Sequence, residues 1–197
     1  MTKSAKKRSK SAALAKTKPL SHSEEVKIQR EKDEALKQTL QYLQDRVKRH
    51  PDLYKNEFVK YWALFKEKLE GFKESPAKKD DQLNYYMLFF SHISHKYKEE
   101  IVGFLPNELL TLVQQYYSIL HPETRFTMVT CLKIFRGKDL VGPIVILPVL
   151  FKLFKCKDKE LRKFLHQGLI SDMKRLNQDA KNNAVNKKLQ SFIFELL

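Results

Sequence analysis

Apolar residues recur at helical spacing along nearly the whole chain from position 23 onward. Between Tyr54 and Phe72 they fall three and four residues apart, a spacing that places side chains on one face of an α-helix. Similar stripes cover 36–47, 83–90, 109–120, 128–135, 144–154, 161–176 and 185–196. No segment alternates apolar and polar residues with a period of two, as a half-buried strand does. The sequence therefore predicts an all-α protein.

Proline and short polar side chains fall where these helices are expected to begin. Proline suits a first helical turn, whose N–H groups have no partner within the helix, and the candidates are Pro51, Pro106, Pro122 and Pro143. Side chains placed to accept backbone N–H bonds at helix starts are Asp52, Asp80, Asn107, Asp158 and Asn182. Gly71 and Gly137 are expected where helices fray or stop. After the first helix, we expect lengths of about 15 to 20 residues, joined by short loops.

Helix pairs recur at about 40 residues, the period of HEAT and armadillo repeats. At 121–125 and 157–162 an acidic or proline start precedes an arginine, and such Asp/Arg pairs form a ladder between repeats in HEAT-like stacks. We predict a HEAT/armadillo-like right-handed α-solenoid of antiparallel helix pairs over 23–197, after a disordered basic arm over 1–22. A plain helical bundle remains the alternative. Because 192–197 is apolar and lacks a polar cap, we expect a longer protein or a docking partner.

The charge excess of +15 is concentrated near the two ends of the chain. Residues 1–20 hold seven basic side chains and no acidic one, and 152–188 hold eleven against four. Clustered cations bind polyanions because they displace the counterions condensed on phosphates, so nucleic acid is the leading partner. An anionic membrane surface, or a merely solvated tail and helix face, are the alternatives. No stretch is apolar for the roughly 20 residues that cross a bilayer, so we expect no membrane-spanning segment. The leading prediction, nucleic acid, includes no membrane partner.

Four of the basic residues in the arm fall within five positions: Lys6, Lys7, Arg8 and Lys10. An extended segment of this kind suits the acidic grooves of nuclear import receptors, and also bare RNA. A mitochondrial transit peptide is the rival, although such peptides favour Arg over Lys. No apolar core of a secretory signal is present. The arm therefore predicts nuclear import.

The basic residues expected to contact a polyanion lie where one predicted helix ends and the next begins. They are Lys152, Lys155, Lys157, Lys159, Arg162 and Lys163, with Lys174 and Arg175 further along. The turn at Asp158 is also expected to offer free N–H groups at a helix start, which favour phosphate oxygens. In the alternative, Arg162 pairs with an acid of a neighbouring repeat and the lysines only keep the edge soluble.

The chain shows no arrangement typical of an enzyme. His92 and His95 have metal-ligand spacing on a helix but no carboxylate or thiolate nearby, so packing or surface roles are favoured. Cys131 and Cys156 behave as small buried apolar residues, which fits a reducing compartment. Trp62 has core spacing rather than that of a base-stacking platform. We therefore expect no catalytic residue, cofactor, metal or small-molecule substrate.

Several segments resemble one known family. They are 151–163, 170–177 and 181–192, with 51–58 and 120–125 upstream. These stretches are similar to those of the severe-depolymerization-of-actin family, nucleolar factors of large ribosomal subunit assembly, and the resemblance covers about 36–197. Family members are several times longer, so the chain resembles their amino-terminal portion, without their acidic middle region.

The resemblance implies a non-enzymatic ribosome biogenesis factor. Such a factor is a helical scaffold on pre-60S particles, needed for maturation of the large subunit and its export from the nucleus. The implied partner is the pre-ribosomal large-subunit particle (rRNA and assembly factors), in the nucleus and nucleolus. The import receptor is expected from the basic arm, which is not part of the resemblance. We interpret the actin phenotype in the family name as indirect. The alternative is a karyopherin-like protein transport adaptor that binds protein cargo only, with weaker dependence on salt.

Overall fold

The computed structural model describes residues 21–178 and 183–196. Within these ranges the chain is helical and contains no strand. The α-helices are α1 His22–Arg49, α2 Lys55–Glu74, α3 Asp81–Ile93, α4 Lys98–Val102, α5 Leu105–Tyr116, α6 Pro122–Gly137, α7 Pro143–Leu153, α8 Lys159–Gln178 and α9 Asn183–Leu196. A 3-10 turn, Asp52–Tyr54, precedes α2. The prediction of an all-α protein is confirmed.

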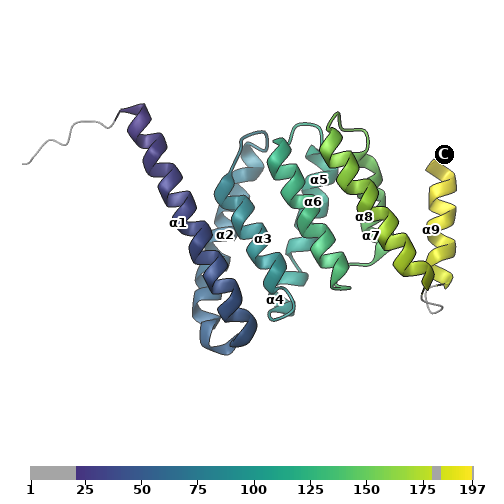
Figure 1. The fold of residues 1–197 in the computed structure, drawn as a ribbon, viewed down its shortest axis with the longest axis horizontal. Coiled ribbons are helices and arrows are strands. Elements are labelled where there is room, and N and C mark those ends of the chain that lie inside the picture. Colours follow the sequence, from purple (N-terminus) through teal and green to yellow (C-terminus); the bar gives the residue numbers. More distant parts are fainter. Residues whose placement is uncertain (1–20, 179–182, 197) are drawn as a thin grey trace, which may run out of the picture.

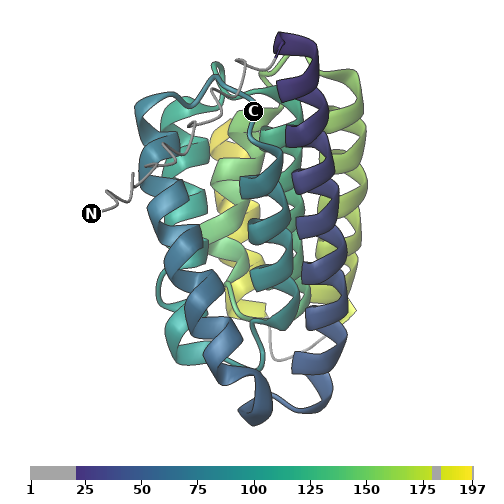
Figure 2. The ribbon, with the colours of Figure 1, turned by 90° about the vertical axis from the view of Figure 1, so that its left-hand side faces the viewer.

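The helices form two layers that are stacked side by side (Figure 1). Helices α1, α3, α6 and α8 make one layer, and α2, α5, α7 and α9 make the other (Figure 2). Within the layers α1 packs on α3, α3 on α6, α5 on α7 and α7 on α9. Each first-layer helix is followed by an antiparallel second-layer helix, so the pairs extend in one direction as a solenoid rather than closing into a bundle.

The stripes found in the sequence are the faces on which the layers meet. Trp62 is only 8% exposed, and its ring lies edge-on to Phe90 of α3 with 4.7 Å between ring centroids. Phe58 stacks on Tyr97 at 3.9 Å, and the Tyr97 hydroxyl donates a hydrogen bond of 2.6 Å to the Pro51 carbonyl. The prediction that Trp62 belongs to the core is confirmed.

Several helix lengths and boundaries differ from the prediction. Helices α3, α5 and α7 have 13, 12 and 11 residues, shorter than expected. Gly71 lies inside α2, which continues to Glu74, and α4 was not predicted because five residues are too few to show a helical period. Helix α1 begins at His22, where Ser21 and Glu24 form a capping box, so the predicted arm overlaps the helix start.

The predicted caps are confirmed at two positions. Asp80 accepts a hydrogen bond from the Leu83 N–H at 2.9 Å, and Asp158 accepts one from the Leu161 N–H at 3.0 Å. Asn107 was wrongly predicted as a cap, because it lies within α5 and its side-chain amide donates to the Gly103 carbonyl. No side-chain cap forms at the 3-10 turn that contains Asp52, which corrects that prediction too. Asn182 lies outside the described residues.

Arginine–aspartate pairs connect neighbouring helix pairs, as the ladder pattern predicted. Arg125 of α6 lies 3.4 Å from Asp158, which immediately precedes α8. A second pair, which the sequence pattern did not identify, joins Arg136 to Asp172 at 2.9 Å. Both arginines are more than nine-tenths buried. The two pairs therefore hold α8 in register on α6.

Candidate functional site

The turn between α7 and α8 forms an exposed corner at one edge of the stack (Figure 1). It spans 154–158, and backbone hydrogen bonds from the N–H groups of Phe154, Lys155 and Cys156 tighten it. Cys156 is buried beneath the turn, where its thiol lies 3.7 Å from the Tyr117 carbonyl oxygen. The turn is thus seated on the segment that follows α5.

Four lysines of this corner are exposed and form no ion pair with any residue that the structure describes. They are Lys155, Lys157, Lys159 and Lys163, and we call them the corner lysines. Two come from the turn and two from the first turns of α8. Their ammonium groups are available to an added anion without the loss of an existing partner.

The two other cations predicted for this corner already have partners. The Lys152 ammonium donates a hydrogen bond of 3.0 Å to the Gln114 carbonyl of α5 and lies 5.2 Å from the centre of the Tyr117 ring. Arg162 donates to the Cys156 carbonyl at 2.7 Å and so fastens the turn to α8. Pairing of Arg162 with an acid, as in the alternative, is not what the structure shows.

Two of the N–H groups at the start of α8 that were expected to be free are already bonded. The Asp158 carboxylate accepts from the Leu161 N–H, and the Arg162 N–H bonds the Asp158 carbonyl at 3.1 Å. The Leu161 bond, together with the nearby Arg125 guanidinium, lowers the pKa of Asp158. A bound phosphate would meet this carboxylate, so phosphate contacts at the corner depend on the lysines.

The structure does not bring Lys174 and Arg175 to the corner. Lys174 is eleven positions beyond Lys163 on α8, which corresponds to about 16 Å along the helix axis. Arg175 is occupied, because it donates to the Arg136 carbonyl at 3.1 Å and lies 3.1 Å and 3.3 Å from carboxylate oxygens of Asp172 and Asp139. Lys174 is exposed. The import residues Lys6, Lys7, Arg8 and Lys10 lie outside the described residues.

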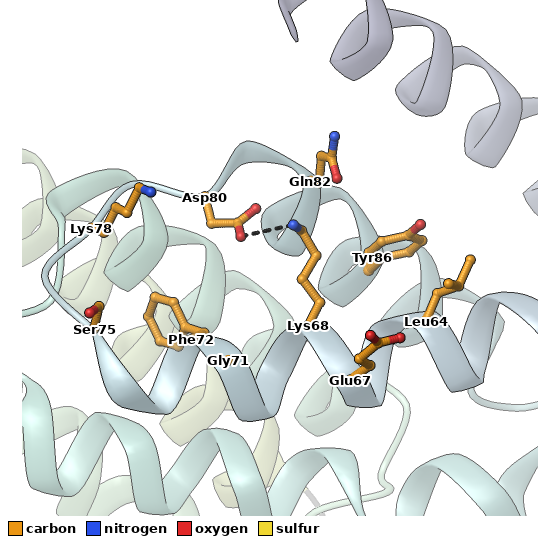
Figure 3. Close-up of a pocket in the computed structure, with 10 residues that line it drawn as sticks. All are labelled: Leu64, Glu67, Lys68, Gly71, Phe72, Ser75, Lys78, Asp80, Gln82 and Tyr86. Carbon is orange, nitrogen blue, oxygen red and sulfur yellow. Dashed lines mark ion pairs between the residues drawn. The ribbon is translucent and has the colours of Figure 1, made fainter.

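A groove of about 550 Å³ lies between the second half of α2 and the start of α3 (Figure 3). The Lys68 ammonium points across it to Asp80, at 3.1 Å. Because Asp80 also caps α3, the two central charged groups of the groove are already used by the fold. The Lys68–Asp80 pair is therefore part of the fold, while Glu67 and Lys78 also line the groove.

Residues 21–178 and 183–196 contain neither a cluster of metal ligands nor a membrane-spanning helix. No group of three or more His, Cys, Asp or Glu side chains in these ranges is placed to hold a metal ion. None of their helices is both long and apolar enough to cross a membrane. Burial raises the pKa of the Cys131 thiol to about 12, which makes it a poor nucleophile.

A second basic group, which no sequence pattern predicted, lies at the opposite ends of the first-layer helices. Lys48 in the last turn of α1, Lys96 after α3 and Lys138 after α6 surround His92 and His95. The spacing of the two histidines suggests metal ligands, packing or surface roles, and gives no indication of the lysines around them. The lysines are 42 to 90 positions from one another in sequence, so no local pattern relates them.

Comparison with known proteins identifies relatives of this chain. The family model described as SDA1, HEAT repeat, matches residues 89–197. The SDA1 homologue of Xenopus laevis is 33% identical over 158 residues, which cover 80% of this chain and 23% of that protein. The homologue of Nematostella vectensis is 31% identical over 172 residues, or 84% of this chain and 25% of that protein. The sda1 protein of Schizosaccharomyces pombe is 29% identical over 171 residues, which cover 86% and 24%. The chain thus spans about a quarter of the length of these curated relatives.

Proposed function

Because the chain belongs to the SDA1 family, to whose amino-terminal portion it corresponds, we propose that it is a non-enzymatic ribosome biogenesis factor. In this proposal it is a helical scaffold on pre-60S particles, needed for maturation of the large ribosomal subunit and for its nuclear export. The HEAT-repeat stack supports the proposal, since solenoids present extended surfaces to large partners.

The observation that carries the proposal is the set of corner lysines. They project from a turn that Arg162 and Cys156 tie to the stack, so an incoming polyanion does not have to order the backbone first. Each lysine that neutralises a phosphate releases a condensed counterion. We therefore assign the corner lysines to contact with rRNA.

The remaining parts of the proposal concern partners and location. The partners are rRNA and assembly factors of the pre-ribosomal large subunit. An import receptor binds Lys6, Lys7, Arg8 and Lys10, and the protein acts in the nucleus and nucleolus. An effect on actin is then an indirect consequence of impaired ribosome assembly.

Co-sedimentation with pre-ribosomal particles tests the proposal in cells. A tagged chain should sediment with pre-60S particles in a sucrose gradient, and changing all four corner lysines to Glu should move it to the free fractions. The matched control changes four exposed lysines of α1 and α2 to Glu: Lys27, Lys32, Lys60 and Lys66. The control has the same net charge as the corner variant and should stay with the particles. Equal loss of co-sedimentation in both variants would show that only the net charge matters. It would contradict the assignment of the corner lysines to rRNA contact.

Direct RNA binding separates this function from that of a cargo adaptor. For the full chain and a single-stranded RNA, the slope of log K against log salt should become shallower by about 3 when the four corner lysines are changed to Glu, at 0.7 per phosphate contact. A karyopherin-like adaptor would instead bind protein through an apolar groove and show little dependence on salt. An affinity that does not respond to salt would therefore favour the adaptor.

A further inference from the structure

The basic group at the far edge of the first layer contains side chains from three parts of the fold. We call Lys48, His92, His95, Lys96 and Lys138 the edge cluster. Lys48 belongs to the last turn of α1, and Arg46 and Arg49 in the same turn add to its charge. Lys138 follows α6, and the other three residues lie at the end of α3 or just after it.

Lys138 fixes the geometry of this cluster. Its ammonium group donates to the carbonyls of Ser91 at 2.8 Å and His92 at 2.5 Å, and it lies 3.3 Å from the Ser94 hydroxyl. All three ammonium protons therefore have partners at the end of α3. Lys138 thus supplies positive charge and holds the backbone at the end of α3, which includes His92, in place. A ligand would contact the other members of the edge cluster.

The electrostatic surroundings of the two imidazoles are cationic. Burial and the charges of Lys138 and Lys48 lower the pKa of His92, and no carboxylate among the described residues contributes there. His95 faces the same two lysines and Lys96, with the same direction of shift. Two acids lie near the cluster. Asp45 is 3.9 Å from the Lys48 ammonium and is largely exposed, and Asp139, which follows Lys138 in the sequence, pairs with Arg136 and Arg175.

Helix stabilisation accounts for only part of this arrangement. Cations at helix C-termini interact favourably with the helix dipole, which explains Lys48 and Lys138 individually. Imidazoles placed among lysines gain nothing from that effect, because each lysine opposes their protonation. A bound anion would change the balance, since it attracts the lysines and favours the protonated imidazoles.

We propose that Lys48, His92, His95 and Lys96 form a second phosphate-binding site for RNA, at the edge of the stack opposite the corner lysines. This inference rests on the proposed function in one respect, namely that the chain binds RNA. The end of α3 and the start of α8 are two helix spacings apart laterally and one helix length apart along the axes, so about 30 Å separates the two sites. A linear polyanion bridges that distance, and its phosphates carry charge along its whole length.

Proton linkage gives the site a distinctive signature. A phosphate beside His92 and His95 stabilises their protonated forms, so binding takes up protons. The affinity therefore increases as the pH falls from about 8 to about 6, through the range in which histidine titrates. Contacts between phosphate and ordinary exposed lysines show no such dependence, because free lysine stays charged throughout this range. Lys138 differs, because burial and the charge of Lys48 lower its pKa to about 8, so it also gains charge as the pH falls.

The test measures binding of a fluorescein-labelled 20-nucleotide oligo-uridine RNA to the full chain at pH 6.0 and 8.0, at constant ionic strength. We expect binding about tenfold tighter at pH 6.0 for the unchanged chain, which corresponds to an average uptake of about half a proton on binding. The H92Q/H95Q variant should lose most of this difference and keep only the part that Lys138 contributes near pH 8. The control H22Q, an exposed histidine at the other end of α1, should keep all of it. Changing Lys48 and Lys96 to Gln should weaken binding severalfold at both pH values.

The outcomes separate this inference from the proposed function. If the corner variant loses RNA affinity but H92Q/H95Q keeps the full pH dependence, the edge site is overturned and the proposed function stands. If the unchanged chain binds no RNA at either pH, both fail. A ten-residue poly-glutamate peptide that displaces RNA at equal charge concentration would overturn the assignment to RNA in favour of an acidic protein. Circular dichroism at both pH values verifies that each variant is folded. If H92Q/H95Q is unfolded, the RNA affinity of the exposed Lys96→Gln variant tests the edge site instead: a loss supports it and an unchanged affinity overturns it.

Discussion

Arg125 and Asp158 are 33 positions apart in the sequence, yet the Arg125 Nη2 lies 3.4 Å from the Asp158 Oδ2. The other terminal nitrogen of Arg125 donates to the Tyr117 carbonyl at 3.0 Å. One buried guanidinium thus joins the end of α5, the start of α6 and the start of α8. The corner lysines depend on this contact for their position, because it holds the turn from which they project.

Arg125→Met should destabilise the fold. The substitution keeps much of the apolar volume but removes the guanidinium from both acceptors. The Tyr117 carbonyl keeps only the weak Cys156 thiol contact, and the Asp158 carboxylate keeps the bond from the Leu161 N–H. We expect a loss of about 2 to 3 kcal/mol in the free energy of unfolding, measured by urea denaturation. Lys163→Met, at an exposed position of α8, is the control and should change it by less than about 0.5 kcal/mol. A loss no larger than that of the control would contradict a structural role for Arg125.

The Asp158 carboxylate should make stability depend on acid pH. Its pKa is lowered in the folded chain, from a usual value of 3.8, first by the Leu161 N–H and then by Arg125. A carboxylate with a lowered folded pKa contributes stability above its unfolded pKa and loses it as the pH falls through the folded one. Asp158→Asn should therefore unfold more easily than the unchanged chain at pH 6, and the difference should shrink toward pH 2. Parallel thermal-melting curves at all pH values would refute this role.

Trp62→Ala should be among the most damaging core substitutions. The ring is 8% exposed and contacts Phe65, Phe90 and Phe104, so its loss leaves a large cavity between α2 and α3. We expect a cost of about 3 to 5 kcal/mol in the free energy of unfolding. If the melting temperature were unchanged while RNA affinity fell, the ring would be a base-stacking platform and the core assignment would fail.

The two thiols should be unreactive in the folded chain. Cys131 is fully buried with a pKa raised to about 12, and burial also raises the pKa of Cys156, which is 6% exposed. A thiol-specific reagent at pH 7.5 should therefore modify neither within minutes, and both after addition of urea. Rapid reaction of Cys156 alone would indicate that the turn at the corner opens on that timescale.

The arm should direct nuclear import. Changing Lys6, Lys7, Arg8 and Lys10 to Ala should shift a fluorescent fusion toward the cytoplasm, because the import receptor loses its four cations. Circular dichroism should show the same helix content in both proteins. Lys27→Ala combined with Lys32→Ala, in α1, is the control and should leave the fusion nuclear. A fusion that stays nuclear without the four cations would point to another signal or to import with a partner.

The sequence by itself determined the helices, their approximate order and the faces that they bury. A period near 3.6 and the caps at Asp80 and Asp158 are encoded within a few residues, so they are recognisable without the fold. The Arg125 ladder contact was also predictable, because an arginine at this place in a repeat has a recurrent partner in the next. Helix α4 was missed because a single turn shows no period.

Only the tertiary structure decided which cations are free. Lys152 and Arg175 resemble the corner lysines in the sequence, but each is bonded to a backbone carbonyl 38 or 39 positions away, in Gln114 and Arg136. Likewise, only the packing of α1, α3 and α6 brings Lys48 and Lys138 to His92. A hydrogen bond or an electrostatic field depends on distance in space, and the local sequence does not specify which distant segments become neighbours.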